Sequence, residues 1–231
     1  MKLRPSEERG KDDKGWLQSS HSFSFESYYD PDYLNFRSLR VLNENRVKPG
    51  KGFGLISHKD MEIITYVLEG VLEYNDSLGN STVIRPGEIQ KITAGTGLAH
   101  RAYNLSHQVP VHYLQAWITP NQIGLEPGFD QKIFSSASKW GQWCLMGSSN
   151  GREGSVRIYQ DVDLYATLLD ENEALTFETF PGRHYWLQVI SGRFLVQETP
   201  LHVGDGAALS DEESIEVHCL ESGELLLFDM A

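Results

Sequence analysis

The sequence predicts an all-β protein built from two tandem β-barrels. Three observations predict it: short runs of β-branched and aromatic residues separated by turn residues, the lack of sustained helical periodicity, and a weak internal repeat. With 231 residues and 40% hydrophobic content, the chain is long enough for one large β domain or for two domains of roughly 100 residues each.

The strand-forming runs follow one another along the chain with Gly, Pro, Asn and Asp between them. Each is short and rich in β-branched or aromatic residues, which is typical of strands. Turn sequences such as NDSLGN (75–80) and PGE (86–88) join neighbouring runs directly, so hairpins are expected rather than strand–helix–strand units. The expected strand segments are 62–76, 81–95, 111–119, 185–198 and 222–230.

The internal repeat relates the two halves of the chain. TYVLEGVLEY (65–74) is similar to LQVISGRFLVQ (187–197), and both predict a strand, a Gly and a second strand. Any two β hairpins share part of this pattern, so a single large domain remains the alternative. Pro and Gly become frequent in segment 119–131, which predicts domains of residues 1–125 and 126–231.

Composition indicates which binding partners and which cellular compartment to expect. Lys and Arg number 20 against 32 Asp and Glu, for a formal charge of −12, and such a surface repels phosphate backbones and anionic lipids. We expect no direct nucleic-acid or membrane partner, and a monomeric, cytoplasmic protein, because no targeting or membrane-spanning segment is recognisable. Cys144 and Cys219 are too few for a disulfide framework or a zinc knuckle, so reduced thiols are expected.

Two histidines and a glutamate are candidates for a site in the first barrel. His58 and Glu62 lie in GFGLISHKDMEI (52–63), and His100 lies in AGTGLAHRAYN (94–104). Residues two apart on a strand face the same side, so a His-x-His pair would direct two imidazoles into one interior, but Ile56 stands at the other position. Iron, manganese, nickel or copper would accept a mixed nitrogen and oxygen set.

A role without metal is the alternative for these histidines. A histidine in a polar interior commonly hydrogen-bonds to a carboxylate, a carbonyl or water. Asp60 or Glu62 would be the partner of His58 in that case, and its pKa would lie near the ordinary value of about 6.5.

Three separated segments resemble a known family. GWLQSSHSFSFESYYDPDYLNFRSLRVLNENRV (15–47), GFG…HKDMEIITYVLEG (52–70) and AGTGLAH…YN (94–104) are similar to the signatures of the pirins, a branch of the cupin superfamily. The resemblance is dense in the N-terminal half and thinner from LQAWITP (114–120) onwards. It implies two jelly-roll type cupin barrels, the second without a metal site.

The resemblance also implies a metal centre, and its ligands can be followed residue by residue. Pirins typically hold one iron with three His and one Glu, in the patterns HxHKDMEI and HxE. Here the second and third His match His58 and His100, whereas the first falls on Ile56 and the Glu on Ala102. Neither replacement can donate to a metal, so a dismantled site and no cofactor are expected. The alternative is one divalent Fe, Ni, Cu or Mn ion, held with Glu62 as substitute ligand.

Two functions follow from the resemblance. The main expectation is a non-catalytic module that senses a small molecule or binds a protein partner through the retained pocket. The alternative is a metal-dependent quercetin 2,3-dioxygenase-type oxidoreductase that uses His58, His100 and Glu62. Aromatic residues near the N-terminus, namely Phe23, Phe25 and Tyr28, could line a flavonoid-sized pocket, although core packing is the commoner use of such residues.

Overall fold

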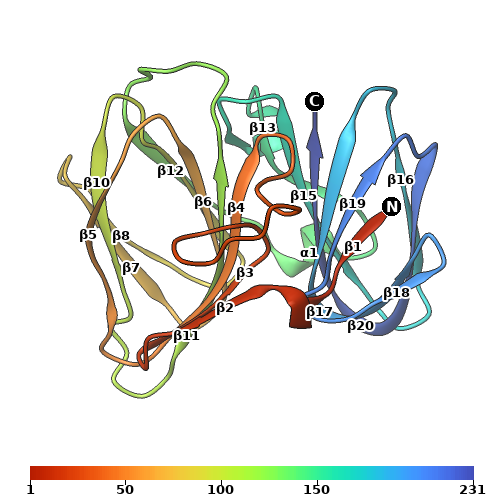
Figure 1. The fold of residues 1–231 in the computed structure, drawn as a ribbon, viewed down its shortest axis with the longest axis horizontal. Coiled ribbons are helices and arrows are strands. Elements are labelled where there is room, and N and C mark those ends of the chain that lie inside the picture. Colours follow the sequence, from red (N-terminus) through yellow and green to blue (C-terminus); the bar gives the residue numbers. More distant parts are fainter. The chain divides into compact units, whose positions relative to one another are not determined.

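The computed structural model describes all residues 1–231 and forms two compact units. The first barrel consists of residues 10–133 and 156–160, and the second barrel consists of residues 1–9, 134–155 and 161–231. Both are built almost entirely from antiparallel strands (Figure 1), which confirms the predicted two-barrel, all-β class. The chain has no helix with the length and apolarity that crossing a membrane requires.

The first barrel contains a seven-stranded and a four-stranded sheet. Their strand orders are β12-β9-β6-β11-β4-β3-β2 and β5-β10-β7-β8. The bounds are β2 (Gly10–Asp13), β3 (Leu17–His21), β4 (Leu39–Val47), β5 (Gly52–His58), β6 (Glu62–Glu69), β7 (Leu72–Asp76), β8 (Ser81–Ile84), β9 (Glu88–Thr93), β10 (Leu98–Tyr103), β11 (Val111–Ile118) and β12 (Gly128–Ile133). The short β14 (Val156–Arg157) belongs to neither of these two sheets. The expected strand segments 62–76, 81–95 and 111–119 correspond to β6–β7, β8–β9 and β11.

The core of the first barrel lies between these two sheets. Ile63 and Val67 of β6 pack in one cluster with Leu72 and Leu98 of the four-stranded sheet, and all four are at most 2% exposed. Because side chains alternate along a strand, the residues two apart from Ile63 share its inward face. Glu62, one residue away, therefore projects from the opposite face of β6.

The boundary between the barrels differs from the predicted one. Strand β12 pairs with β9 from Gly128 to Ile133, so the first barrel extends past residue 125. Strand β1 (Lys2–Arg4) pairs instead with β19, so the first nine residues belong to the second barrel. Both differences arise from strand pairings between residues far apart in the sequence. The frequent Pro and Gly of segment 119–131 do not indicate such pairings.

A short segment from the second half of the sequence completes the first barrel. The backbone N–H of Asn121 donates to Tyr159 O at 2.7 Å, and Gln160 Nε2 donates to Thr119 O at 2.8 Å. The N–H of Tyr159 also donates to Glu62 Oε2 at 3.3 Å. Residues 156–160 are therefore part of the first barrel, although the chain leaves that barrel at residue 133 and returns later.

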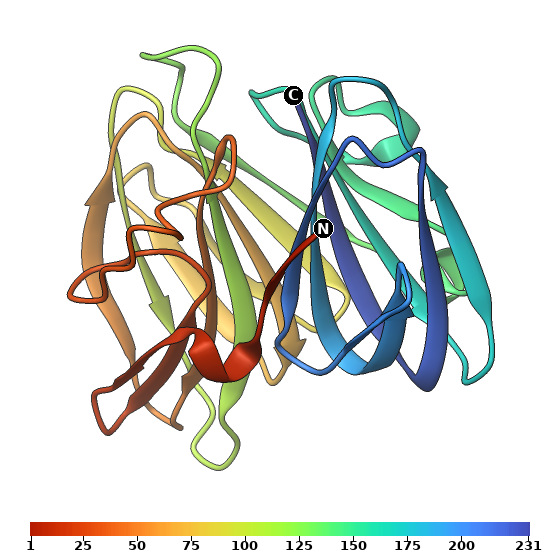
Figure 2. The ribbon, with the colours of Figure 1, turned by 45° about the vertical axis from the view of Figure 1, so that its right-hand side comes forward.

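The second barrel has two unusually long strands as its framework. Strands β17 and β20, in the blue part of the ribbon in Figure 2, pair with each other. The sheet runs β1-β19-β17-β20-β15-β13, with β16 on β20 and β18 on β17. Its elements are β1, η1 (Ser6–Glu8), α1 (Ser136–Lys139), β13 (Cys144–Ser148), η2 (Arg152–Gly154), β15 (Val162–Leu169), β16 (Ala174–Glu178), β17 (His184–Val196), β18 (Thr199–Leu201), β19 (Gly206–Ser210) and β20 (Ser214–Met230).

The second copy of the predicted repeat is a single strand rather than two. In the first copy Gly70 separates β6 from β7, as expected, but Gly192 lies inside β17, where the pairing with β20 shifts register. Gly192 has φ +77°, and a Cβ on the facing Gly223 would lie 2.0 Å from Ser191 O. Two close-packed glycines therefore let both strands bend without ending.

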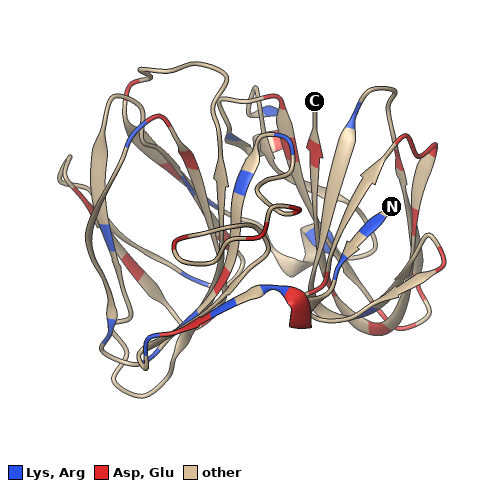
Figure 3. Ribbon diagram, viewed as in Figure 1, with Lys and Arg blue, Asp and Glu red and all other residues tan.

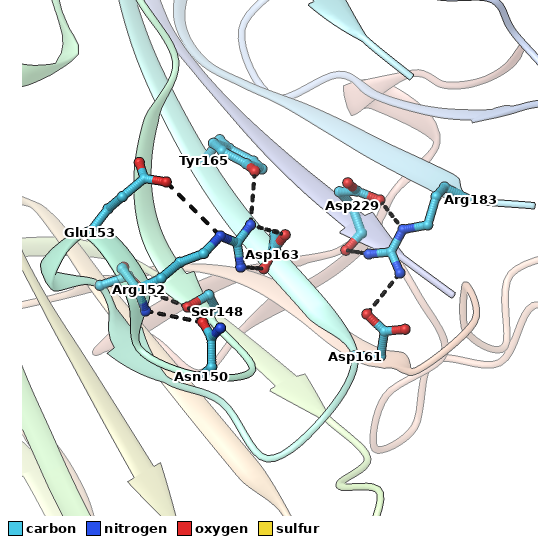
Figure 4. Close-up of polar contacts among 10 residues, drawn as sticks. Ser148, Asn150, Arg152, Glu153, Asp161, Asp163, Tyr165, Arg183 and Asp229 are labelled. Carbon is cyan, nitrogen blue, oxygen red and sulfur yellow. Dashed lines mark hydrogen bonds and ion pairs between the residues drawn. The ribbon is translucent and has the colours of Figure 1, made fainter. Parts of the chain in front are cut away.

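Arginine–aspartate pairs stabilise the second barrel, as Figure 4 shows. Arg152 contacts both carboxylate oxygens of Asp163, at 2.9 and 2.5 Å. Arg183 Nε donates to the buried Asp229 at 2.6 Å, and its Nη1 donates to Asp161 at 2.7 Å. Two guanidinium groups thus face three carboxylates. In both barrels basic positions are interspersed with acidic ones rather than gathered in one stripe (Figure 3).

Candidate functional site

A pocket opens into the interior of the first barrel. Its volume is about 680 Å³ when the open mouth is included. Strands β3, β4 and β11 of the seven-stranded sheet form one wall, and strands β5 and β10 of the four-stranded sheet form the other.

All four positions that the resemblance assigns to metal ligands line this pocket. His58 and Ile56 come from β5, and His100 and Ala102 come from β10. His100 pairs with Ile56 and Ala102 pairs with Phe53, so two steps along β10 correspond to three along β5. Because of this β-bulge, residues three apart on β5, rather than two apart, face the same side at this point. Phe53 as well as Ile56 can therefore face the pocket.

The two histidines meet at the inner end of the pocket. Their ring centroids lie 5.0 Å apart, and the ring of Tyr74 lies 5.5 Å from His100. His100 is 5% exposed, and neither its Nδ1 nor its Nε2 has a hydrogen-bond partner. His58 packs edge to face against Trp117, with a centroid distance of 4.9 Å.

Both imidazoles are uncharged at neutral pH. The pKa of His100 is lowered to about 4, mainly by burial and also by the neighbouring His58, while the charge of Asp76 opposes the shift. Burial also lowers the pKa of His58 below its ordinary value. The expected carboxylate partners of His58 lie elsewhere: Asp60 accepts the N–H of Gly124 at 2.7 Å, and Glu62 lies on the other face of its strand.

Glu62 does not join the histidines. Its side chain is fully buried, and Lys91 Nζ lies 3.8 Å from its Oε2. Burial raises the pKa of the Glu62 carboxyl, while the charge of Lys91 opposes that shift. The structure contains no group of three or more His, Cys, Asp or Glu side chains arranged to hold a metal ion. The facial set of two imidazoles and the Glu62 carboxylate is therefore not formed.

The donors that remain do not fit a metal ion held by the protein alone. Catalytic metal sites commonly have three protein ligands, such as two His and one carboxylate. His58 and His100 supply two nitrogens, whereas Ile56 and Ala102 present only carbon atoms to the same pocket.

Opposite the histidines runs a row of polar side chains that the sequence reasoning missed. Each of these residues is hydrogen-bonded inside the barrel, and alternation along 43–47 and 111–117 could have indicated their inward direction. His21 Nδ1 lies 2.8 Å from Asn43 Oδ1, and Ser19 donates to Asn45 at 2.5 Å. Gln115 Oε1 accepts the indole N–H of Trp117 at 3.0 Å. All six residues line the pocket.

The aromatic residues expected in the pocket have different positions. Phe25 lies in its wall and packs edge to face on Trp117, at a centroid distance of 5.4 Å. Phe23 is instead buried in the protein, at 1% exposure, and Tyr28 packs against Gly10. The cluster of aromatics near the N-terminus thus contributes one pocket residue of the three expected.

Charged side chains lie at the mouth of the pocket. Lys14 Nζ contacts Glu26 at 2.9 Å and Asp12 at 3.2 Å, and all three residues are among those that line it. The hydrogen bond to Glu26 raises the pKa of Lys14, so the ammonium group stays charged over the physiological range.

The buried imidazoles predict a pH dependence of stability. The unfolded chain takes up protons on His58 and His100 below pH 6.5, whereas the folded barrel excludes them until lower pH. Their stabilisation is therefore present above pH 6.5 and is lost as the pH falls through the folded pKa, which is about 4 for His100. For His100 the full effect corresponds to roughly 3 kcal/mol.

Urea unfolding at a series of pH values between 4 and 7.5 measures this effect. The His100→Phe variant lacks the titrating group, so its stability should fall less steeply with acidification than that of the wild type. Parallel curves for the two proteins would contradict a depressed pKa at His100.

Comparison with known proteins agrees with this architecture. The Pirin family model matches residues 2–118, and the model described as Quercetinase C-terminal cupin domain matches residues 145–230. Quercetin 2,3-dioxygenase of Escherichia coli strain K12 is 40% identical over 228 residues, which are 99% of this chain and 97% of the relative. A Pirin-like protein of Caulobacter vibrioides is 34% identical over 229 residues, covering 99% of this chain and 98% of the relative.

Solved structures give the same result. The crystal structure of the bacterial pirin YhhW from Escherichia coli, in complex with nickel(II), has a TM-score of 0.95 and 40% sequence identity. The match covers 99% of this chain and 98% of that chain. Its sequence motifs, its two barrels and these relatives lead to one conclusion: the chain belongs to the pirin family.

Proposed function

We propose that the pocket of the first barrel binds a planar phenolic compound of the flavonol class. We further propose that the protein acts on it as a quercetin 2,3-dioxygenase-type oxidoreductase. Relatives at 40% identity carry that name over nearly the whole chain, which supports the substrate class. The structural observation that carries the proposal is an aromatic-walled pocket whose inner end consists of two uncharged imidazoles.

The walls of the pocket suit a flat aromatic ligand. Phe25, Phe53 and Trp117 all face it, and Phe53 is supported from outside by an edge-to-face contact with Trp16 at 5.2 Å. Aromatic side chains pack favourably on ring systems through faces and edges. They would hold a fused ring while excluding water from it.

The inner end of the pocket suits a hydroxyl group on that ligand. An unsatisfied buried donor or acceptor costs about 1–3 kcal/mol, and neither ring nitrogen of His100 has a partner. An uncharged imidazole carries one lone pair, so a phenolic O–H can donate to it. His100 would thereby fix the hydroxyl-bearing edge of the ligand, with His58 beside it at the same end.

A second candidate function is a binding module without turnover. It is favoured by Ile56 and Ala102, which leave the pocket with two metal donors in place of four. With Ile56 and Ala102 in the pocket, the barrel would remain stable with no ion bound. Both the buried charge of an ion and the polar side chains that would bind it are then absent. In this case the bound compound itself would be the signal.

The experiment that tests the proposal is a titration with quercetin under anaerobic conditions, followed through tryptophan fluorescence. We expect saturable binding by the wild type and about tenfold weaker binding by His100→Ala, because roughly one hydrogen bond is lost. The matched control is His107→Ala, since His107 is exposed and lies outside the pocket. An absence of saturable binding would overturn the proposal.

Turnover distinguishes the two candidates. Oxygen is then admitted with Fe, Ni, Cu or Mn salts, and quercetin absorbance and O2 uptake are followed together. Matched loss of quercetin and O2 that depends on His100 supports the oxidoreductase. Binding without consumption under every condition supports the module instead.

A further inference from the structure

We propose that the amide groups of Asn43, Asn45 and Gln115 select polyhydroxylated flavonols over sparsely substituted ones. Their N–H groups donate hydrogen bonds to oxygen atoms on the outer rings of the ligand. The inference rests on the proposed function, because it takes a flavonol as the occupant of the pocket, and it names the residues that distinguish one flavonol from another. In this arrangement the 3-hydroxyl lies at His100, and the outer rings lie against the opposite wall.

The three amides lie next to one another on adjacent strands. Asn43 and Asn45 are two residues apart on β4 and share one face, and Gln115 of β11 pairs directly with Asn43. On the other side of β4, His21 and Ser19 of β3 pair with Asn43 and Asn45. Residues that pair across antiparallel strands have Cβ atoms about 5 Å apart. All five side chains line the pocket, so they form one compact polar patch on its wall.

The orientation of the Gln115 amide is fixed by its neighbour. The indole N–H of Trp117 donates to Gln115 Oε1 at 3.0 Å. An indole N–H can only donate, so the oxygen of Gln115 must face Trp117 and the NH2 group points away from it. Gln115 Nε2 has no hydrogen-bond partner in the protein. The two N–H donors of this side chain are therefore available to a ligand.

The two asparagines repeat this arrangement. Ser19 Oγ donates to Asn45 Oδ1 at 2.5 Å, and His21 Nδ1 lies 2.8 Å from Asn43 Oδ1. In both cases the amide oxygen makes the contact, and Nδ2 has no partner in the protein. Both asparagines are buried, so the pocket is where these hydrogens can meet an acceptor. The wall thus presents three NH2 groups whose companion oxygens are already occupied.

The patch suits neutral oxygen atoms. Lys14 lines the same pocket, but its ammonium group already contacts Glu26 and Asp12. The charged side chains of the lining therefore carry one more negative than positive charge, which disfavours a carboxylate, sulfate or phosphate on the ligand. Hydroxyl and carbonyl oxygens accept hydrogen bonds without carrying a charge. The hydroxyl groups on the outer rings of a flavonol are acceptors of this kind.

A ligand without these oxygens is disfavoured by the same groups. A bare ring against the patch would displace water from the amide hydrogens and give them no acceptor. Sites built to hydrogen-bond a substrate discriminate strongly against an analogue that lacks the matching group. Quercetin and 3-hydroxyflavone differ only in the hydroxyl groups on the outer rings, so the patch should distinguish them. His100 should not, because both compounds carry the 3-hydroxyl.

Equilibrium dialysis of the full-length protein against each flavonol, under anaerobic conditions, tests the inference. Gln115→Glu and Asn45→Asp keep the oxygen that accepts from Trp117 or Ser19, but each replaces the NH2 donor by an acceptor. Gln115→Met removes the donor without adding a charge. The matched control is Gln108→Glu, since Gln108 is exposed and lies outside the pocket. Circular dichroism checks that each variant is folded, and the two Gln115 variants decide the result if Asn45→Asp does not fold.

We expect the wild type and Gln108→Glu to bind quercetin at least about tenfold more tightly than 3-hydroxyflavone. Each donor variant should weaken quercetin binding about tenfold and leave 3-hydroxyflavone binding unchanged, because only quercetin meets the lost donor. His100→Ala should instead weaken both flavonols by the same factor. A general disturbance of the pocket would also weaken both alike, so the ratio of the two affinities reports recognition of the outer rings.

The outcomes separate this inference from the proposed function. Equal affinity of the wild type for the two flavonols overturns the inference. Donor variants that bind quercetin as tightly as the wild type, or that lose both flavonols to the same extent, also overturn it. In each of these cases the wild type still binds a flavonol, so the proposed ligand class stands. If the wild type binds neither compound, the proposed function fails and the inference fails with it.

Discussion

The double substitution Ile56→His with Ala102→Glu is expected to give a first barrel that retains a divalent transition metal without any added ligand. Both side chains line the same pocket as His58 and His100, and Ile56 pairs with His100 across β5 and β10. The variant would have three imidazoles and one carboxylate. A hydrogen-bonded partner of a metal ligand contributes roughly 10- to 100-fold to affinity, so two direct ligands should contribute at least about 10³-fold.

Metal analysis after dialysis against nickel or iron measures this gain. The matched control is Leu55→His with Arg101→Glu, which adds the same residue types one position away on the same strands, where both side chains are exposed. The control should retain no more metal than the wild type. A folded Ile56→His, Ala102→Glu variant that releases its metal would show that positions 56 and 102 do not converge on the imidazoles.

The substitution Glu62→Leu is expected to lower the free energy of unfolding by about 3–5 kcal/mol, because it leaves a buried charge without its partner. Lys91 is 5% exposed, its Nζ lies 3.8 Å from Glu62 Oε2, and it also donates to the hydroxyl of Thr93 at 2.8 Å. Burial already lowers the pKa of Lys91, and the charge of Glu62 opposes that shift. Without Glu62 the ammonium group loses the larger of the charge interactions that favour its charged form, while the charge of Asp130 and the ring of Tyr159 remain.

The companion variant Glu62→Leu with Lys91→Met removes both charges. Replacing a buried ion pair by apolar residues is often neutral or stabilising, so this double variant should recover most of the lost stability. Denaturant unfolding of the wild type and the two variants measures the difference. If the single variant is as stable as the wild type, Lys91 is not confined to an apolar environment at this position.

Much of the fold is predictable because local patterns specify it. Gly70 separates two strands as the sequence predicts, and the turns at 75–80 and 86–88 separate β7, β8 and β9. Features that depend on distant contacts are not predictable in this way. Gly192 resembles Gly70 in sequence, yet it lies within one strand because Gly223 across the sheet lets the two backbones approach closely.

The candidate site is also predictable where a sequence motif marks it, and not where it depends on contacts between distant residues. The motif positions of His58, His100, Ile56 and Ala102 are sufficient to place all four side chains in one pocket. The expected role of Glu62 as a substitute metal ligand is wrong because side chains alternate along β6. Ile63 points into the core between the sheets, so the neighbouring Glu62 points the other way. The hydrogen-bonded residues on the opposite wall carry no motif, and their roles become visible only when β3, β4 and β11 are assembled.

The return of residues 156–160 to the first barrel has a consequence for how this protein can be divided. A gene fragment that stops at residue 133 would encode every long strand of that barrel but would lack the N–H group of Tyr159, which donates to the buried Glu62. Such a fragment would expose an ion pair that the intact chain shields from water. No single continuous stretch of sequence therefore encodes either complete barrel.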